Sequence, residues 1–169
     1  TTPALGSLLR CFKLPEVGGD TLFANMTMAY DTLSDGMKKL IADLHGIHLS
    51  GTRKINVAEK GAERRTEVMK LNPPIAQPVV RVHPETGRKA LFVNVAHTAG
   101  IEGMTDEESA PILHFLFAHQ VKPEFTCRGA WAPNAIAFWD NRCVQHNPVN
   151  DYHGFKRLMH RITLQGDKP

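Results

Sequence analysis

Apolar residues in this chain fall into short runs that are separated by glycine, proline and asparagine. Residues 5–14 form one such run, which ends at Pro15, so a buried strand and a following turn are expected. The runs at 78–82 and 89–95 flank the turn sequence Pro-Glu-Thr-Gly and predict a β-hairpin. Further strands are expected at 21–26, 124–128, 135–139 and 158–164, with a loop over 146–156.

The first helix is expected over residues 35–44, where apolar side chains recur at helical spacing opposite polar ones. Ser34 provides a typical N-cap for it, and a short helical turn over 27–33 precedes it. His45 and His48 are expected at the end of this helix, where an imidazolium suits the last carbonyl groups.

A second helix begins at Thr105, because three acidic residues follow in its first turn and apolar residues then recur on one face to about His119. Short strands joined by Gly, Pro and Asn turns, with a few helices beside them, indicate an α+β architecture. Its sheets are expected to be mainly antiparallel, as in a sandwich or a barrel. No internal repeat is present, so residues 1–169 are expected to form a single domain.

Residues 50–72 differ from the rest because they are rich in charge and poor in large apolar side chains. We expect an exposed excursion that is partly helical near 59–70. The sequence Asn72-Pro73-Pro74 ends it, since proline disfavours helix in the residue before it.

Composition excludes several classes of protein. The chain has 169 residues, 42% of them hydrophobic, and a net charge of +3 without any block of like charges, so a nucleic-acid partner is not expected. No apolar run approaches the roughly 20 residues that span a bilayer, so no membrane partner is expected either. Its three cysteines form no C-x-x-C pair, which indicates reduced thiols and a cytoplasmic location.

Polar and basic residues gather toward the end of the chain. His146 follows an apolar strand and stands out for that reason among nine histidines. Arg157 and Arg161 are four positions apart, so both point to the same face of an extended strand. Two guanidinium groups on one face need anions, either a small dianionic ligand or ion pairs with residues such as Asp140 and Asp151. The spacing leaves both alternatives open.

The segment from Trp139 to Pro169, with WDNRCVQHNPVNDY and KRLMHRITLQGDKP, closely resembles the C-terminal part of the taurine dioxygenase family of Fe(II)- and 2-oxoglutarate-dependent oxygenases. Further pieces match in order: PALGS with LPEVGGDT, AYDTLS, PVVRVHPETGRKALFVN and FLFAHQVKPEF. The resemblance covers nearly the whole chain and is weakest over 45–72. It implies a double-stranded β-helix, or jelly roll, with flanking helices, so the expected class is α+β and mainly β.

The resemblance also implies roles for individual residues. His146 stands where the family has the distal histidine ligand of its iron, and Thr21 and Arg157 stand where it binds the distal carboxylate of 2-oxoglutarate. Arg161 matches the residue that binds the substrate's anionic group or lies near the cosubstrate, and His97 matches a substrate-contacting position. The implied cofactors are Fe(II), 2-oxoglutarate and O2, with the metal in a facial site of two histidines and one carboxylate.

One departure from the family is that the chain has no H-x-D motif, which supplies the other two iron ligands. The nearest approach, His83-Pro84-Glu85, falls in the predicted hairpin turn and is not expected to replace it. We therefore expect the chain to be the C-terminal part of a longer enzyme, with the N-terminal part of the jelly roll missing, and to be inactive alone.

The resemblance predicts a dioxygenase that hydroxylates a small anionic substrate, such as a sulfonate, an alkyl sulfate or an aryloxyalkanoate. The alternative is a non-catalytic, metal-free homologue or fragment that keeps only the carboxylate pocket. A hydrolytic zinc enzyme is disfavoured because H-E-x-x-H is absent. For His97 the alternative is a histidine in a surface loop. Members of the family are commonly dimers or tetramers, so a homo-oligomer is also expected.

Overall fold

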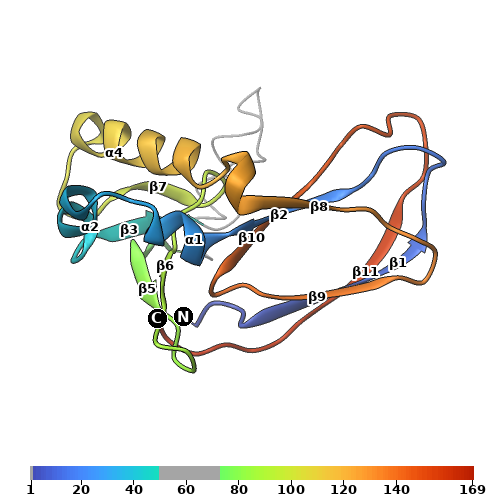
Figure 1. Ribbon diagram of the computed structural model, residues 1–169, viewed down its shortest axis with the longest axis horizontal. Coiled ribbons are helices and arrows are strands. Elements are labelled where there is room, and N and C mark those ends of the chain that lie inside the picture. Colours follow the sequence, from blue (N-terminus) through green and yellow to red (C-terminus); the bar gives the residue numbers. More distant parts are fainter. Residues whose placement is uncertain (1, 50–72) are drawn as a thin grey trace.

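The computed structural model describes residues 2–49 and 73–169. Its strands pair only in antiparallel fashion within the described residues. Two three-stranded sheets form the elongated part of the molecule (Figure 1). Sheet A has the strand order β11 (Leu158–Thr163), β1 (Gly6–Lys13) and β9 (Ile136–Asp140). Sheet B has the order β10 (Val144–Pro148), β2 (Thr21–Asn25) and β8 (Thr126–Gly129).

The other end of the molecule holds the helices and two smaller groups of strands (Figure 1). Sheet C has the order β4 (Ile75–Pro78), β3 (His45–His48) and β7 (Thr98–Ile101), and a hairpin joins β5 (Val80–Val82) to β6 (Lys89–Leu91). Helix α4 packs on β7 and α1 on β6. The helical elements are α1 (Met26–Asp31), α2 (Asp35–Ile41), α4 (Asp106–His119) and the 3-10 turn η1 (Pro123–Phe125). None of the described helices is both long and apolar enough to cross a membrane.

The main apolar core lies at this helical end. Its fully buried members come from the first two helices, from the hairpin region and from α4, and include Met26, Ile41, Leu91, Val93 and Leu116. Residues buried between sheets A and B include two polar ones, Ser7 and Thr21, each at 0% exposure, beside the apolar Cys11 and Trp139. Since burial of polar groups costs free energy unless they find partners, these two hydroxyls make the space between the sheets a candidate site.

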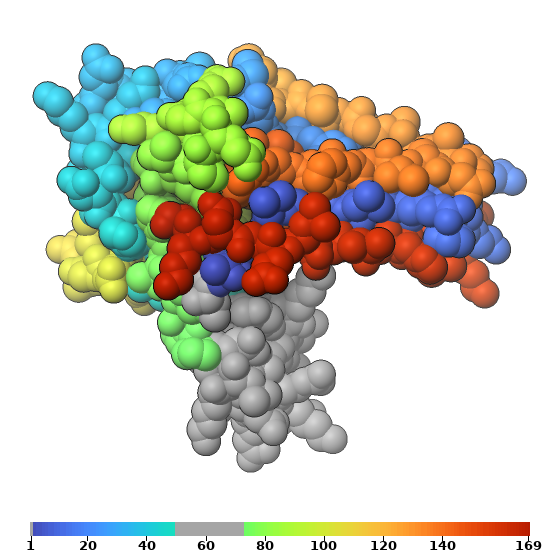
Figure 2. All heavy atoms as spheres, turned by 90° about the horizontal axis from the view of Figure 1, so that it is seen from below, coloured from blue at the N-terminus to red at the C-terminus, as the bar shows by residue number. Residues whose placement is uncertain are grey.

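The first and last strands lie side by side. Strand β1 pairs with β11, with Ser7 opposite Thr163 and Leu9 opposite Arg161. Figure 2 shows these segments together along one face of the molecule, the N-terminal one in blue and the C-terminal one in red. Backbone hydrogen bonds between Leu5 and Leu164 continue the contact beyond the strand ends.

Most of the predicted elements are confirmed. The helix expected from Thr105 is α4, and Thr105 and Glu108 form a capping box at its start. Ser34 accepts a hydrogen bond from the Met37 backbone and caps α2, as expected. The strand predicted over 5–14 is β1, and the hairpin is confirmed in shorter form. The excursion predicted over 50–72 lies outside the described residues.

Three predictions about local structure are wrong. His45 and His48 do not end a helix, because α2 ends at Ile41 and both histidines lie in β3. His146 lies inside β10 rather than in a loop, since its backbone pairs with Phe23 of β2. Residue 124 belongs to the 3-10 turn, and β8 begins only at Thr126. For the three histidines the pairing strand lies far away in the sequence, so the local pattern carries little sign of it.

Candidate functional site

The inner faces of sheets A and B meet through aromatic contacts. Trp139 of β9 packs edge-on against Phe23 of β2, with ring centroids 5.3 Å apart. The same indole lies 4.7 Å from the His146 ring on β10. Contacts between side chains of two different sheets establish that these faces enclose a common interior, which is the geometry of a jelly roll.

His146 lies on the same face of sheet B as Thr21. In the antiparallel ladder His146 is opposite Phe23 and Pro148 is opposite Thr21, so His146 and Thr21 are diagonal neighbours across β10 and β2. Burial lowers the pKa of His146 and the nearby Arg161 guanidinium lowers it further, and both effects favour the neutral imidazole. A neutral imidazole has the free lone pair that a metal ion requires.

His146 does not belong to any group of three metal-binding side chains within the described part of the chain. The family's facial site needs two further ligands, and these are not among the residues near His146 that the structure describes. Among the described residues, His146 could therefore supply one ligand of such a site, and the complete set is not present.

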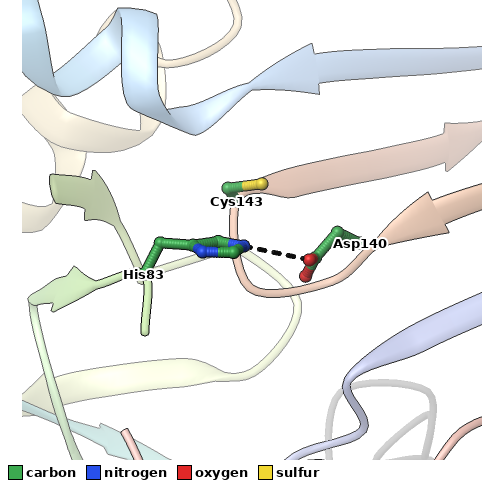
Figure 3. Close-up of side chains that lie close together, drawn as sticks. All are labelled: His83, Asp140 and Cys143. Atoms are coloured by element: carbon green, nitrogen blue, oxygen red, sulfur yellow. Dashed lines mark hydrogen bonds and ion pairs between the residues drawn. The ribbon is translucent and has the colours of Figure 1, made fainter. Parts of the chain in front are cut away.

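Another trio, His83, Asp140 and Cys143, brings possible metal ligands within 4.8 Å of one another (Figure 3). Its hydrogen bonds argue against a metal ion. The Nδ1 atom of His83 accepts from the backbone amides of Glu85 and Thr86, so Nε2 carries the proton and donates to Asp140 Oδ2 at 3.1 Å.

Asp140 also accepts from Arg142, and the Nη2–Oδ2 distance is 2.6 Å. Burial by itself raises the pKa of the Asp140 carboxyl, but hydrogen bonds from Arg142 and His83 outweigh it and lower that pKa to about 2. Arg142 is 4% exposed and contacts Glu85 through both terminal nitrogens. The trio is thus part of a saturated ion-pair network and not a vacant metal site.

Arg157 lies just before β11 and turns toward Thr21. Its Nε donates to the Gly19 carbonyl at 2.8 Å, and its Nη2 lies 3.5 Å from Thr21 Oγ1. Both Gly18 and Gly19 have positive φ angles, 86° and 77°, which turn this carbonyl toward the guanidinium at little steric cost. Asp151 holds the same loop, because its Oδ1 accepts from the Gly19 amide at 2.7 Å.

Arg161 turns to the same interior from β11 and donates to Ser7 Oγ at 2.9 Å. Neither Arg157 nor Arg161 forms an ion pair with a carboxylate among the described residues, because Asp140 pairs with Arg142 and Asp151 pairs with Arg128. Of the two alternatives that the sequence left open, the structure therefore does not contain the ion pairs with Asp140 and Asp151. The two cations remain available to an external anion.

His97 lies apart from these residues, in the connection between β6 and β7. Its Nδ1 is 3.4 Å from the Leu49 carbonyl oxygen, and its ring lines an open hollow of about 440 Å³ beside α4. Asp106 and His114 of α4 line the same hollow, whereas His146, Arg157 and Arg161 do not. Within the described residues no hydrogen bond joins His97 to the interior of sheets A and B, so a contact with substrate stays a prediction.

The sequence did not single out Ser7 or Trp131, and it offered Asp151 only as an ion-pair partner of the two arginines. Ser7 binds Arg161, Asp151 orders the glycine loop, and Trp131 donates from its Nε1 to Thr21 Oγ1 at 3.0 Å. Nothing in the local sequence links the Trp131 indole to Thr21. These partners are 110 positions or more apart.

The antiparallel sandwich has the geometry of a jelly roll, and one imidazole and two guanidinium groups that form no ion pair among the described residues lie on the facing sides of its sheets. Residues 1–163 match the family model described as "Taurine catabolism dioxygenase TauD, TfdA family". The chain belongs to this family, as the sequence resemblance predicted.

Similar proteins from several organisms carry related names. The chain is 36% identical over 166 residues to an "Alkylsulfatase" of Acinetobacter baylyi, covering 95% of this chain and 52% of that protein. It is 37% identical over 161 residues to an "Alpha-ketoglutarate-dependent 2,4-dichlorophenoxyacetate dioxygenase" of a Burkholderia species, covering 95% and 53%. The chain thus spans about half the length of these relatives.

Solved structures with the same fold superpose on most of this chain. A crystal structure of AAD-2 in complex with Mn(II) and N-oxalylglycine superposes with a TM-score of 0.89 at 32% identity, covering 99% of this chain and 66% of that one. A crystal structure of a taurine dioxygenase from Burkholderia xenovorans gives a TM-score of 0.83 at 33% identity, covering 98% and 54%. The prediction of a double-stranded β-helix with flanking helices is confirmed.

Proposed function

We propose that this chain acts in an Fe(II)- and 2-oxoglutarate-dependent dioxygenase that hydroxylates a small anionic organic substrate. The observation that carries the proposal is the pair of Arg157 and the buried Thr21 hydroxyl, with no carboxylate paired to that guanidinium among the described residues. A guanidinium and a hydroxyl side by side match the two oxygens of a carboxylate. The names of the relatives, several of which are alpha-ketoglutarate-dependent dioxygenases, support this ligand.

Each residue of the interior would have a distinct task. Thr21 and Arg157 would hold the distal carboxylate of 2-oxoglutarate, and His146 would supply one imidazole ligand to iron. Two further ligands would come from polypeptide that the structure does not describe. Trp139 and Phe23 form an apolar wall beside His146 and would exclude water from the reacting end of the cosubstrate.

The reaction balances without any other oxidant. One atom of O2 enters the substrate, where a C–H bond becomes C–OH, and the other enters succinate as 2-oxoglutarate loses CO2. Bound iron supplies the chemistry that activates O2. Hydroxylation beside a sulfonate, sulfate or ether group gives an unstable product that collapses to a carbonyl compound.

The substrate is proposed as a sulfonate, an alkyl sulfate or an aryloxyalkanoate. Arg161 would pair with its anionic group, because this guanidinium lies near His146 and its one described hydrogen bond is to the neutral Ser7 hydroxyl. His97 would contact the substrate's organic part if the β6–β7 connection borders the complete cavity. Named relatives include proteins for each of these three substrate classes.

The test is turnover by the full-length protein with Fe(II), 2-oxoglutarate and a panel of the three substrate classes. Succinate that forms only with iron and rises several-fold with one class would support the proposal. Binding of 2-oxoglutarate without any succinate, across the panel and with iron retained, would favour the non-catalytic alternative instead.

A further inference from the structure

The Thr21 hydroxyl is contacted only by hydrogen-bond donors among the described residues. Thr21 is fully buried, at 0% exposure. Two groups point at its Oγ1: the indole Nε1–H of Trp131 at 3.0 Å and the guanidinium Nη2–H of Arg157 at 3.5 Å. An indole and a guanidinium can only donate hydrogen bonds, so Oγ1 acts as an acceptor toward both.

The Thr21 hydroxyl proton must therefore point in a third direction. Within the described residues it has no acceptor, since both hydrogen bonds recorded for Oγ1 are received ones. A buried hydroxyl without an acceptor is costly, and the cost disappears when an anion enters the space in front of Arg157. Of the two hydrogen bonds that Oγ1 accepts, the one from Trp131 is the shorter and therefore the stronger.

The backbone explains why Trp131 reaches this hydroxyl. Thr21 is paired with Gly129 at the end of the β2–β8 ladder, and Trp131 follows Gly129 by two positions. A Cβ atom on Gly129 would lie 3.1 Å from the Phe23 ring, so the glycine allows β8 to approach β2 closely at this point. The chain then carries the Trp131 ring, which is partly buried, alongside Thr21.

We propose that Trp131 is a positioning residue that holds the Thr21 hydroxyl as a hydrogen-bond donor toward the distal carboxylate of the cosubstrate. This inference rests on the proposed function of the Thr21–Arg157 pocket. The indole N–H occupies one lone pair of Oγ1. The hydroxyl proton therefore cannot point toward Trp131 and is directed toward the bound carboxylate. Trp131 itself touches no ligand and acts only through Thr21.

The experiment is a double-mutant cycle in the full-length protein, with Mn(II) in place of Fe(II) so that no turnover occurs. Calorimetry measures the dissociation constants of 2-oxoglutarate and of 2-oxobutyrate, which lacks the distal carboxylate, for wild type, Trp131→Phe, Thr21→Val and the double variant. We expect Trp131→Phe to weaken 2-oxoglutarate about three- to tenfold, as for one lost hydrogen bond, and to leave 2-oxobutyrate unchanged. In the Thr21→Val background Trp131→Phe should then add nothing.

Equal losses for the two ligands, or additive losses in the double variant, would overturn the role of Trp131. The control variant Phe138→Leu, on the exposed outer face of sheet A, should bind both ligands as wild type does. Failure of wild type itself to bind 2-oxoglutarate more tightly than 2-oxobutyrate would instead refute the proposed function of the pocket.

A second measurement covers the case in which Trp131→Phe does not fold. NMR spectra of the protein labelled with ¹⁵N-tryptophan show one indole N–H signal for each tryptophan. The signal that differs between wild type and Thr21→Val is assigned to Trp131. That signal should shift when 2-oxoglutarate is added and stay in place with 2-oxobutyrate. An unmoved signal at saturating 2-oxoglutarate would overturn the inference.

Discussion

The Trp139 indole lies 4.7 Å from the His146 imidazole, although the two rings belong to different sheets. The Nε1 of Trp139 donates to Asn141 Oδ1 at 2.9 Å, and Asn141 in turn donates to Ser7 Oγ at 3.1 Å. Ser7 is the hydroxyl that receives Arg161. A continuous chain of contacts thus joins the proposed metal ligand to the proposed substrate anchor, so the two positions are set together by the packing of the sheets.

Replacing Arg157 by alanine should weaken 2-oxoglutarate binding in the full-length enzyme by about 2 to 5 kcal/mol, because the variant leaves a buried carboxylate without its charged partner. Calorimetric titration measures the change. The matched control is Arg10→Ala, since Arg10 is an exposed arginine of β1 that binds Asn134 outside the pocket. An unchanged affinity in Arg157→Ala would remove this residue from the cosubstrate site.

Arg161→Ala should raise the KM of the anionic substrate more than that of 2-oxoglutarate. The reason is that Arg161 lies near His146 and hydrogen-bonds to the neutral Ser7 hydroxyl, whereas Arg157 is bound to the glycine loop beside Thr21. Steady-state kinetics with each substrate varied in turn separate the two effects. Equal increases in both KM values would mean that the two arginines do not have separable roles.

Asp151 orders the loop that positions Arg157, although the carboxylate itself lies outside the pocket. Asp151→Ala removes the acceptor of the Gly19 amide, and we expect 2-oxoglutarate to bind roughly three- to tenfold more weakly, as for one lost hydrogen bond. Asp151→Asn keeps an acceptor oxygen and should restore most of the affinity. Dissociation constants from the same titration compare the two variants, and identical losses would show that charge rather than the hydrogen bond matters.

Asp140→Asn should destabilise the full-length protein by about 2 to 3 kcal/mol, because the buried Arg142 loses its nearest anion and retains the more exposed Glu85 and, at 3.9 Å, Asp167. Since the folded-state pKa of Asp140 is lowered to about 2, its stabilising effect is complete above about pH 4 and is lost as the pH falls toward 2. Urea denaturation measures the change.

The control for Asp140 is Asp31→Asn, which breaks the exposed pair with Arg88 and should cost at most about 1 kcal/mol. Metal content offers an independent check on the same variant. It should not change in Asp140→Asn, because we assign the trio of His83, Asp140 and Cys143 to an ion-pair network. A loss of bound metal in that variant would contradict the assignment.

His48 should make stability depend on pH. Burial lowers the pKa of His48 to about 4, and the nearby His97 contributes further, so the unfolded chain binds this proton more readily than the folded one. The free energy of unfolding should therefore fall as the pH drops from 6.5 to 4. Denaturation at several pH values should show that His48→Gln removes part of this slope, whereas the exposed His153→Gln retains it. An unchanged slope in His48→Gln would assign the effect to other groups.

The sequence predicted correctly those elements that are determined by contacts between residues close in the sequence. The capping box of Thr105 and Glu108 and the cap at Ser34 are contacts over three residues, and both helices begin where expected. Strand β3, with the sequence His-Gly-Ile-His, has no clear alternation of apolar and polar residues. It exists because β4 and β7 pair with its two edges, and that information lies in distant segments.

In the candidate site, too, some residues could be predicted from the sequence and others only from the folded structure. His146, Thr21 and Arg157 were named from a family resemblance, and the structure brings Thr21 together with Arg157 and places His146 on the same sheet face as Thr21. Trp131 was not named and Asp151 was named only as an ion-pair partner, because their hydrogen bonds to Thr21 and Gly19 span 110 and 132 positions. No spacing rule connects such pairs, so only the folded structure identifies them.

The pairing of β1 with β11 has a kinetic consequence. Arg161 and Ser7 are 154 positions apart, so their contact requires closure of a loop that includes nearly the entire chain. Loop closure costs entropy that grows with loop length, and folds dominated by such distant contacts fold slowly. We therefore expect the proposed anion site to be completed late in folding. An anion that binds there would stabilise only molecules that have finished folding, and would act as a selective reporter of the native state.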